Sequence, residues 1–122
     1  MKNLEILKLS AKAMGLKVID YTNDYDGRDG VILCDEFGRH TRSWDPINND
    51  EDSFRLAMHL QIDIIHDVLS TDASVDSINC GSKKEYGVEE AEWVEEAVDG
   101  NVLKASRLAI ARAAANIGAL MS

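Results

Sequence analysis

The stretch SWDPINNDEDSFRLAMHL, residues 43–60, contains the only proline of the chain, one of its two tryptophans and three consecutive acids. Pro46 fixes its own φ and disfavours helical geometry at the preceding residue, so the stretch begins extended. Asn49 stands at the position of an N-cap, and the acids after it fill a first helical turn, where carboxylates meet free N–H groups. The stretch therefore predicts a helix that starts near residue 50 and continues to about residue 61.

Before this helix, the sequence predicts one amphipathic helix and one β-hairpin. Apolar residues recur at helical spacing over about residues 2–14, and Gly15 follows where a left-handed C-terminal cap would lie. LKVIDY (16–21) and GVILCD (30–35) are rich in Val and Ile, as strands are. The residues between them, TNDYDGRD, favour a turn.

After the helix, apolar residues recur at every second position instead of at helical spacing. Ile62 and Ile64 alternate with Asp63, which predicts a strand over 62–69 with apolar neighbours on both faces. SVDSINCG (74–81) is its expected partner strand. Residues 83–100 favour either an irregular arm or an edge strand, and the alanine-rich segment 102–120 predicts a long helix.

The expected order is α-ββ-α-ββ-α, which defines the class α+β. We expect a mainly antiparallel sheet of about four strands with helices on its faces. The 122 residues, with no repeat or low-complexity linker, predict one domain over 1–122. Residues 83–100 form its acidic variable arm.

Composition disfavours several classes of function. The 22 acids outnumber 13 Lys and Arg residues, so the net charge of −9 repels a phosphate backbone, and we expect no direct nucleic-acid binding. No apolar run has the length of a membrane span, and the N-terminus lacks a signal-peptide core. Cys34 and Cys80 lie in apolar runs, as reduced thiols do. These features predict a cytoplasmic protein.

No motif with a known mechanism is present. The loop 23–30 is rich in Asp, but Arg28 occupies a donor position of an EF-hand loop and no suitable Glu follows. The three histidines, His40, His59 and His66, show no zinc-ligand spacing, and neither cysteine has a CxxC partner. Nucleophile elbows and phosphate loops are also missing. The sequence therefore predicts no catalytic residues, no metal site and no cofactor.

The arm offers a candidate binding surface instead. Seven acids lie between Glu85 and Asp99 without a base, around an aromatic residue that the local period does not bury. Such a surface suits a basic partner, although a charge run is most often a solvated face. The candidate binding residues are Glu89, Glu90, Trp93, Glu95 and Glu96. Trp44 is a further candidate, with burial as an anchor of the fold as the alternative.

Two parts of the chain resemble small phage and prophage proteins of the phage ABA sandwich type. In that family a W-x-P-x-N/D-D motif introduces the middle helix, and an Ala/Arg-rich helix closes the chain. The matching residues are Trp44, Pro46, Asn48, Asn49, Asp50, Ala57 and Leu60, then Arg107, Ala109, Ile110, Arg112, Ala113 and Ala114. The resemblance implies helices on both faces of a sheet and a host bacterial cell. It implies no activity, because no catalytic residues accompany the motifs.

Three functions are consistent with the sequence. The first is a phage or prophage accessory protein that binds an unknown host or phage protein, expected to be basic, through an acidic surface. The second is a small metal-dependent or other enzyme whose site is assembled from scattered residues such as His40, His66 and the loop around Asp24. The third is a structural homo-oligomer that associates through apolar helix faces.

Overall fold

The computed structural model describes residues 1–22, 29–67, 77–82 and 93–121. These residues form three helices and six strands, and the strands make two antiparallel sheets. In the first half, helix α1 (Asn3–Ala13) precedes β1 (Lys17–Thr22), β2 (Asp29–Cys34) and β3 (His40–Trp44). The second half consists of α2 (Asp50–His59), β4 (Asp63–Asp67), β5 (Ser77–Gly81), β6 (Val94–Ala97) and α3 (Val102–Leu120).

Each sheet is an up-and-down meander with its second strand in the centre. The first sheet has the order β1-β2-β3, and Val31 of β2 lies opposite Trp44 of β3. The second sheet has the order β4-β5-β6, and Cys80 of β5 lies between Ile64 and Val94. Each outer strand therefore pairs with a described strand along only one of its two edges.

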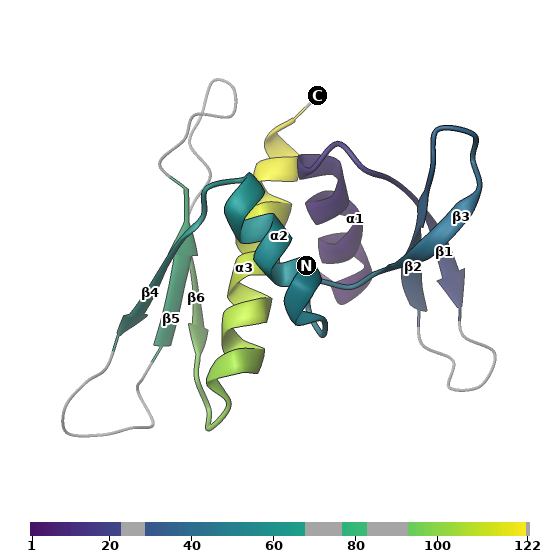
Figure 1. The fold of residues 1–122 in the computed structure, drawn as a ribbon. Coiled ribbons are helices and arrows are strands. Elements are labelled where there is room, and N and C mark those ends of the chain that lie inside the picture. Colours follow the sequence, from purple (N-terminus) through teal and green to yellow (C-terminus); the bar gives the residue numbers. More distant parts are fainter. Residues whose placement is uncertain (23–28, 68–76, 83–92, 122) are drawn as a thin grey trace.

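The helices form a layer between the two sheets (Figure 1). Helix α1 packs on α3 and covers β1 and β2, whereas α3 covers β5 and β6. Helix α2 packs on α3 beside this contact. Each sheet consequently has one face toward the helices and one face directed away from them.

The core lies where the helices meet each other and the inner faces of the sheets. Trp44, Leu56 and Ile117 are almost fully inaccessible to solvent. Helix α3 contributes a run of buried alanines, and a Cβ at Gly118 would lie 2.0 Å from the carbonyl oxygen of Leu9 on α1. Small side chains on α3 allow this close helix contact, as at other tightly packed helix pairs.

The local signals in the sequence are confirmed at the helix ends. The side chain of Asn49 accepts a hydrogen bond from the amide of Asp52 at 3.0 Å, as an N-cap does. Gly15 has a φ of 72°, and the amide of Leu16 donates to Ala11 at 2.9 Å, which closes α1 with a left-handed cap.

The α+β class and the antiparallel pairing are confirmed, but the arrangement differs from a sheet of about four strands with helices on its faces. Six strands form two sheets, and the order is α-βββ-α-βββ-α. β3 was not predicted, because four of its five side chains are exposed and no apolar alternation marks it. Val94–Ala97 is an edge strand, one of the two alternatives for the arm.

Two arginines that carry the family resemblance join α3 to other elements. Arg107 donates from Nε to the carbonyl of Ile47 at 2.9 Å and pairs with Asp50 at 2.7 Å, so it holds the start of α2. Arg112 pairs with Glu96 and donates to the carbonyl oxygen of Glu95, so it holds β6. Both guanidinium groups therefore have structural partners.

Candidate functional site

The face of the second sheet that points away from the helices gathers acidic and apolar side chains. Ile78, Cys80 and Val94 are buried toward the helices, so the residues that alternate with them point outward. The strand register aligns these outward positions in three rows across the sheet. We call this surface the outer face; its members are Asp63, Ile65, Asp67, Ser77, Asn79, Gly81, Trp93, Glu95 and Ala97.

Trp93 is held on the outer face by a glycine. A Cβ at Gly81 would lie 2.4 Å from the Trp93 ring, so the absence of a side chain on β5 allows the indole to lie against the strand. The residue remains 42% exposed. Ile65, in the next row, is 47% exposed. The outer face thus presents two large apolar side chains to solvent.

The same face carries three carboxylates. Asp63 and Asp67 belong to β4, Glu95 belongs to β6, and none of the three forms an ion pair with a described residue. Asp67 accepts a hydrogen bond from the Asn79 side chain at 2.6 Å. No Lys, Arg or His occupies the nine positions of the outer face.

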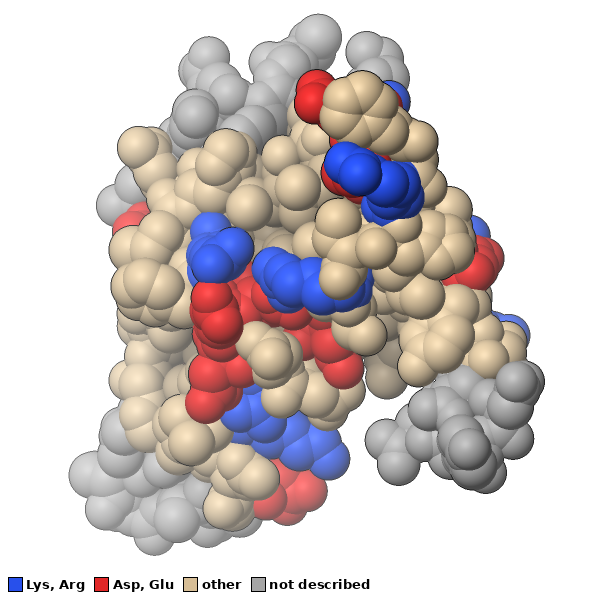
Figure 2. Space-filling model, turned by 45° about the vertical axis from the view of Figure 1, so that its right-hand side comes forward, with Lys and Arg blue, Asp and Glu red and all other residues tan. Residues whose placement is uncertain are grey.

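Other parts of the described surface are different. Several acids are paired with bases there: Asp20 with Lys8, Glu51 with Arg55, and Asp35 with Arg39. Figure 2 shows basic and acidic side chains side by side on the face that it presents. On that face acids therefore lie beside bases, whereas the three carboxylates of the outer face have no ion-pair partner among the described residues.

The structure separates the two glutamates that the sequence places together. Glu95 lies opposite Asn79 and points outward, whereas Glu96 lies opposite Ile78 and points toward α3, where it pairs with Arg112. Adjacent residues of a strand point to opposite faces, so only Glu95 is available to a partner. Glu96 is a structural residue in this arrangement.

Glu89 and Glu90 lie outside the described residues. The outer face also includes Asp63, Ile65 and Asp67, which were not among the predicted binding residues. The alternation of DIIHD already indicated that these three side chains share a face. What the sequence did not indicate was that this face is directed away from the helices.

Trp44 is part of the core. It is 1% exposed, and its indole Nε1 donates to the Ser10 hydroxyl at 3.1 Å, which in turn donates to the carbonyl of Leu7 at 2.9 Å. A buried indole usually has such an acceptor. The structure therefore agrees with the alternative of a buried anchor, and the indole is not accessible to a partner.

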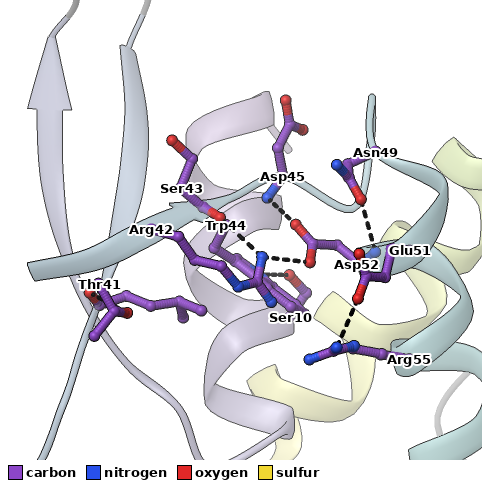
Figure 3. A network of polar contacts seen from close by, with 11 residues as sticks. Ser10, Thr41, Arg42, Ser43, Trp44, Asp45, Asn49, Glu51, Asp52 and Arg55 are labelled. Atoms are coloured by element: carbon purple, nitrogen blue, oxygen red, sulfur yellow. Dashed lines mark hydrogen bonds and ion pairs between the residues drawn. The ribbon is translucent and has the colours of Figure 1, made fainter.

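The neighbouring polar network is also structural (Figure 3). The side chain of Asp52 is 2% exposed and accepts hydrogen bonds from Arg42 at 2.8 Å and from the Asp45 amide at 3.0 Å. Its own amide donates to Asn49. The carboxylate thus joins the end of β3 to the first turn of α2, and all of its described contacts serve this connection.

No metal centre is assembled from the described residues. In the parts of the chain that the structure describes, no group of three or more His, Cys, Asp and Glu side chains is arranged to hold a metal ion. His40 and His66, named for the scattered enzyme site, lie in different sheets, and Asp24 lies outside the described residues.

One cleft opens between the start of α1, the first sheet and the turn after β3. Its volume is about 650 Å³, and its walls include Leu4, Tyr21, Val31 and Ile47. Lys2 and Asp29 contribute opposite charges to its lining. This lining shows no nucleophile with an adjacent base and no cluster of one charge, so it indicates no particular chemistry.

Comparison of the chain with protein-family models, with curated protein sequences and with solved structures finds no match. Among the described residues, no helix is both long enough and apolar enough to cross a membrane.

Proposed function

We propose that this chain is an accessory protein of a phage or prophage and that it acts by binding a basic partner protein through the outer face of the second sheet. The proposed source rests on the resemblance of residues 44–60 and of α3 to the phage ABA sandwich type. In this proposal the protein works in the cytoplasm of the host bacterium. Its partner is a host or phage protein.

One observation carries the binding proposal: three carboxylates that form no ion pair with a described residue share one face with two exposed apolar side chains. Negative charge attracts a basic partner and steers its approach. Trp93 and Ile65 supply apolar contact area of the kind that stabilises a complex once it has formed. A solvated surface with no partner would more often contain bases among its acids.

The test uses an oligolysine peptide as a model for the basic partner. We expect the peptide to bind the wild-type protein and to bind more weakly as salt is raised from about 0.1 M to about 1 M, because the screening length falls from about 10 Å to about 3 Å. Asp63→Asn/Asp67→Asn/Glu95→Gln should abolish binding. Isothermal titration calorimetry gives the dissociation constants.

A matched variant removes the same amount of charge from other sites. Glu5, Glu36 and Glu51 are exposed and lie outside the second sheet, so Glu5→Gln/Glu36→Gln/Glu51→Gln should retain binding. Equal weakening by both triple variants would show that net charge, and not the outer face, controls the interaction. That result would contradict the proposal.

Self-association is a second candidate, favoured by a different observation. Phe54 and Met58 lie one turn apart on α2 and are 63% and 55% exposed. Such a pair could form the apolar centre of a contact between two copies. Sedimentation equilibrium tests this candidate: a dimer that Phe54→Ser/Met58→Ser converts to a monomer supports it, and a monomeric wild-type protein contradicts it.

A further inference from the structure

Among the described residues, β4 is an edge strand of the second sheet. It pairs with β5 on one side, and no other described strand lies along its second edge. Figure 1 shows β4 at the border of the second sheet, with the helices on the far side of β5 and β6. All five of its side chains are exposed. An edge strand of this kind presents backbone N–H and C=O groups that can pair with another chain.

The side chains of β4 make this edge attractive to an extended segment. Ile64 and Ile65 are each 47% exposed, and they lie on opposite faces of the strand. A strand added beside β4 would cover part of both side chains, because side chains of neighbouring strands pack against each other on each face. The edge therefore offers apolar contact on both faces in addition to main-chain hydrogen bonds.

Charge decides which strand can be added. Asp63 and Asp67 lie at the two ends of β4, on the same face as Ile65. If a second copy paired antiparallel about Ile65, each Asp63 would lie opposite an Asp67, and like charges directly opposite destabilise a sheet. The net charge of −9 opposes self-association further. The edge thus disfavours its own copy and favours a strand with bases at the matching positions.

We propose that β4 is a strand-addition site for an extended basic segment of a partner protein. The segment would pair with the edge of β4 opposite β5 and extend the second sheet. This proposal rests on the proposed function, because it specifies how a basic partner engages the sheet that carries the outer face. Strand addition is an established mode of peptide recognition in which main-chain bonds give affinity and alternate side chains give specificity.

The register fixes a sequence rule for the partner. In an antiparallel strand, bases lie beside Asp67 and Asp63, and an apolar residue lies between them beside Ile65. A second apolar residue lies beside Ile64 on the opposite face. The segment Lys-Thr-Val-Val-Lys satisfies the rule. Val-Lys-Thr-Lys-Val has the same composition and charge, but its bases point to the face that Ile64 occupies.

The experiment measures binding of these two peptides, each flanked by serines and blocked at both ends. We expect the first peptide to bind about tenfold more tightly than the second, a difference of about 1.4 kcal/mol, because only its two bases lie beside Asp67 and Asp63 on the same face. Asp63→Asn/Asp67→Asn should remove this preference. Glu5→Gln/Glu36→Gln, which lie outside the second sheet, should leave it unchanged.

N-methylation of the first peptide tests the backbone contact itself. Alternate N–H groups of a paired strand point toward its neighbour. N-methyl groups at one set of alternate positions should therefore abolish binding, and those at the other set should leave it intact. Nuclear Overhauser effects between the peptide and β4 amides should accompany binding.

The outcomes separate this inference from the proposed function. Equal binding of both peptides that is still lost in the Asp63→Asn/Asp67→Asn/Glu95→Gln variant would overturn strand addition and leave the acidic face in place. Equal binding that persists in that variant would overturn both proposals. Absence of binding by the first peptide, or equal tolerance of both N-methylation patterns, would overturn strand addition.

Discussion

The indole of Trp44 shows how one side chain joins the first sheet to the helix layer. It lies at the end of β3 and reaches Ser10 on α1, so it fixes the position of a strand relative to a helix distant in sequence. Trp44 is therefore a buried anchor of the fold, which the sequence analysis gave as the alternative to a binding residue. A buried aromatic residue of this size contributes strongly to stability.

Trp44→Ala should lower the free energy of unfolding by about 3–5 kcal/mol, the range for truncation of a buried aromatic residue. Trp44→Phe, which keeps most of the apolar volume, should cost less. Urea denaturation followed by circular dichroism measures both values. An unchanged denaturation midpoint in Trp44→Ala would contradict the burial of the indole.

The two cysteines differ in accessibility. Both are free thiols; Cys80 is fully buried on the inner face of β5, whereas Cys34 in β2 is half-buried. Burial raises the pKa of the Cys80 thiol to about 11 from its ordinary value of 9.0, because the thiolate loses hydration. We expect a thiol reagent to label Cys34 first and Cys80 only after unfolding. Rapid labelling of Cys80 in the native protein would be inconsistent with the structure.

The same shift in the Cys80 pKa predicts a pH dependence of stability. The unfolded chain loses the thiol proton near pH 9.0 and the folded chain near pH 11, so the contribution of the neutral thiol is complete below pH 9.0 and decreases above it. The slope between these values is about 1.4 kcal/mol per pH unit for one proton. Denaturation of the wild-type protein and of Cys80→Ala at several pH values measures this contribution to the free energy of unfolding. The decrease above pH 9.0 should be absent from the variant.

At the scale of elements, the contact of α1 with α3 depends on Gly118. An Ala in the middle of a helix is normally favoured over Gly by about 1 kcal/mol. Here its Cβ would lie 2.0 Å from the carbonyl oxygen of Leu9, so the helices would have to separate. The cost of this clash should exceed the gain in helix propensity from replacing Gly118 by Ala.

Gly118→Ala should therefore destabilise the protein by about 1–3 kcal/mol or more, as overpacking of a dense contact does. Lys104→Ala on the exposed side of α3 is the control and should change stability by less than about 0.5 kcal/mol. Chemical denaturation compares the two midpoints. A stabilised Gly118→Ala protein would show that α1 and α3 are farther apart than the structure places them.

The helices could be predicted from sequence because their signals are local. Asn49, the acids after it and Gly15 specify helix ends within a few residues, and the structure has caps there. The strand β3 could not be predicted in this way, because its pairing with β2 is a long-range contact and its exposed side chains carry no period. The outer face was predictable as a set of side chains on β4, but its orientation depended on tertiary packing.

For the whole molecule, the arrangement predicted from the sequence and the arrangement in the structure differ mainly in the position of the helices. Apolar residues on both faces of 62–69 predicted a sheet between helices. In the structure the helices lie between the two sheets, so Ile65 is exposed on the outer face, which points away from them. Ile64 is exposed on the other face because β4 lies at the border of the sheet, away from the helices. Helix α3, buried on most sides through its alanines, takes the central position.

In this arrangement no other described element covers the outer face of the second sheet, and our central proposal is that a basic partner binds there. Chemical-shift mapping on ¹⁵N-labelled protein tests the claim most directly, with oligolysine as the probe. We predict that the largest changes occur at amides of β4, β5 and β6 and at the indole N–H of Trp93, and that salt suppresses them. Changes centred on α2 or on the first sheet, or spread evenly over the surface, would contradict it.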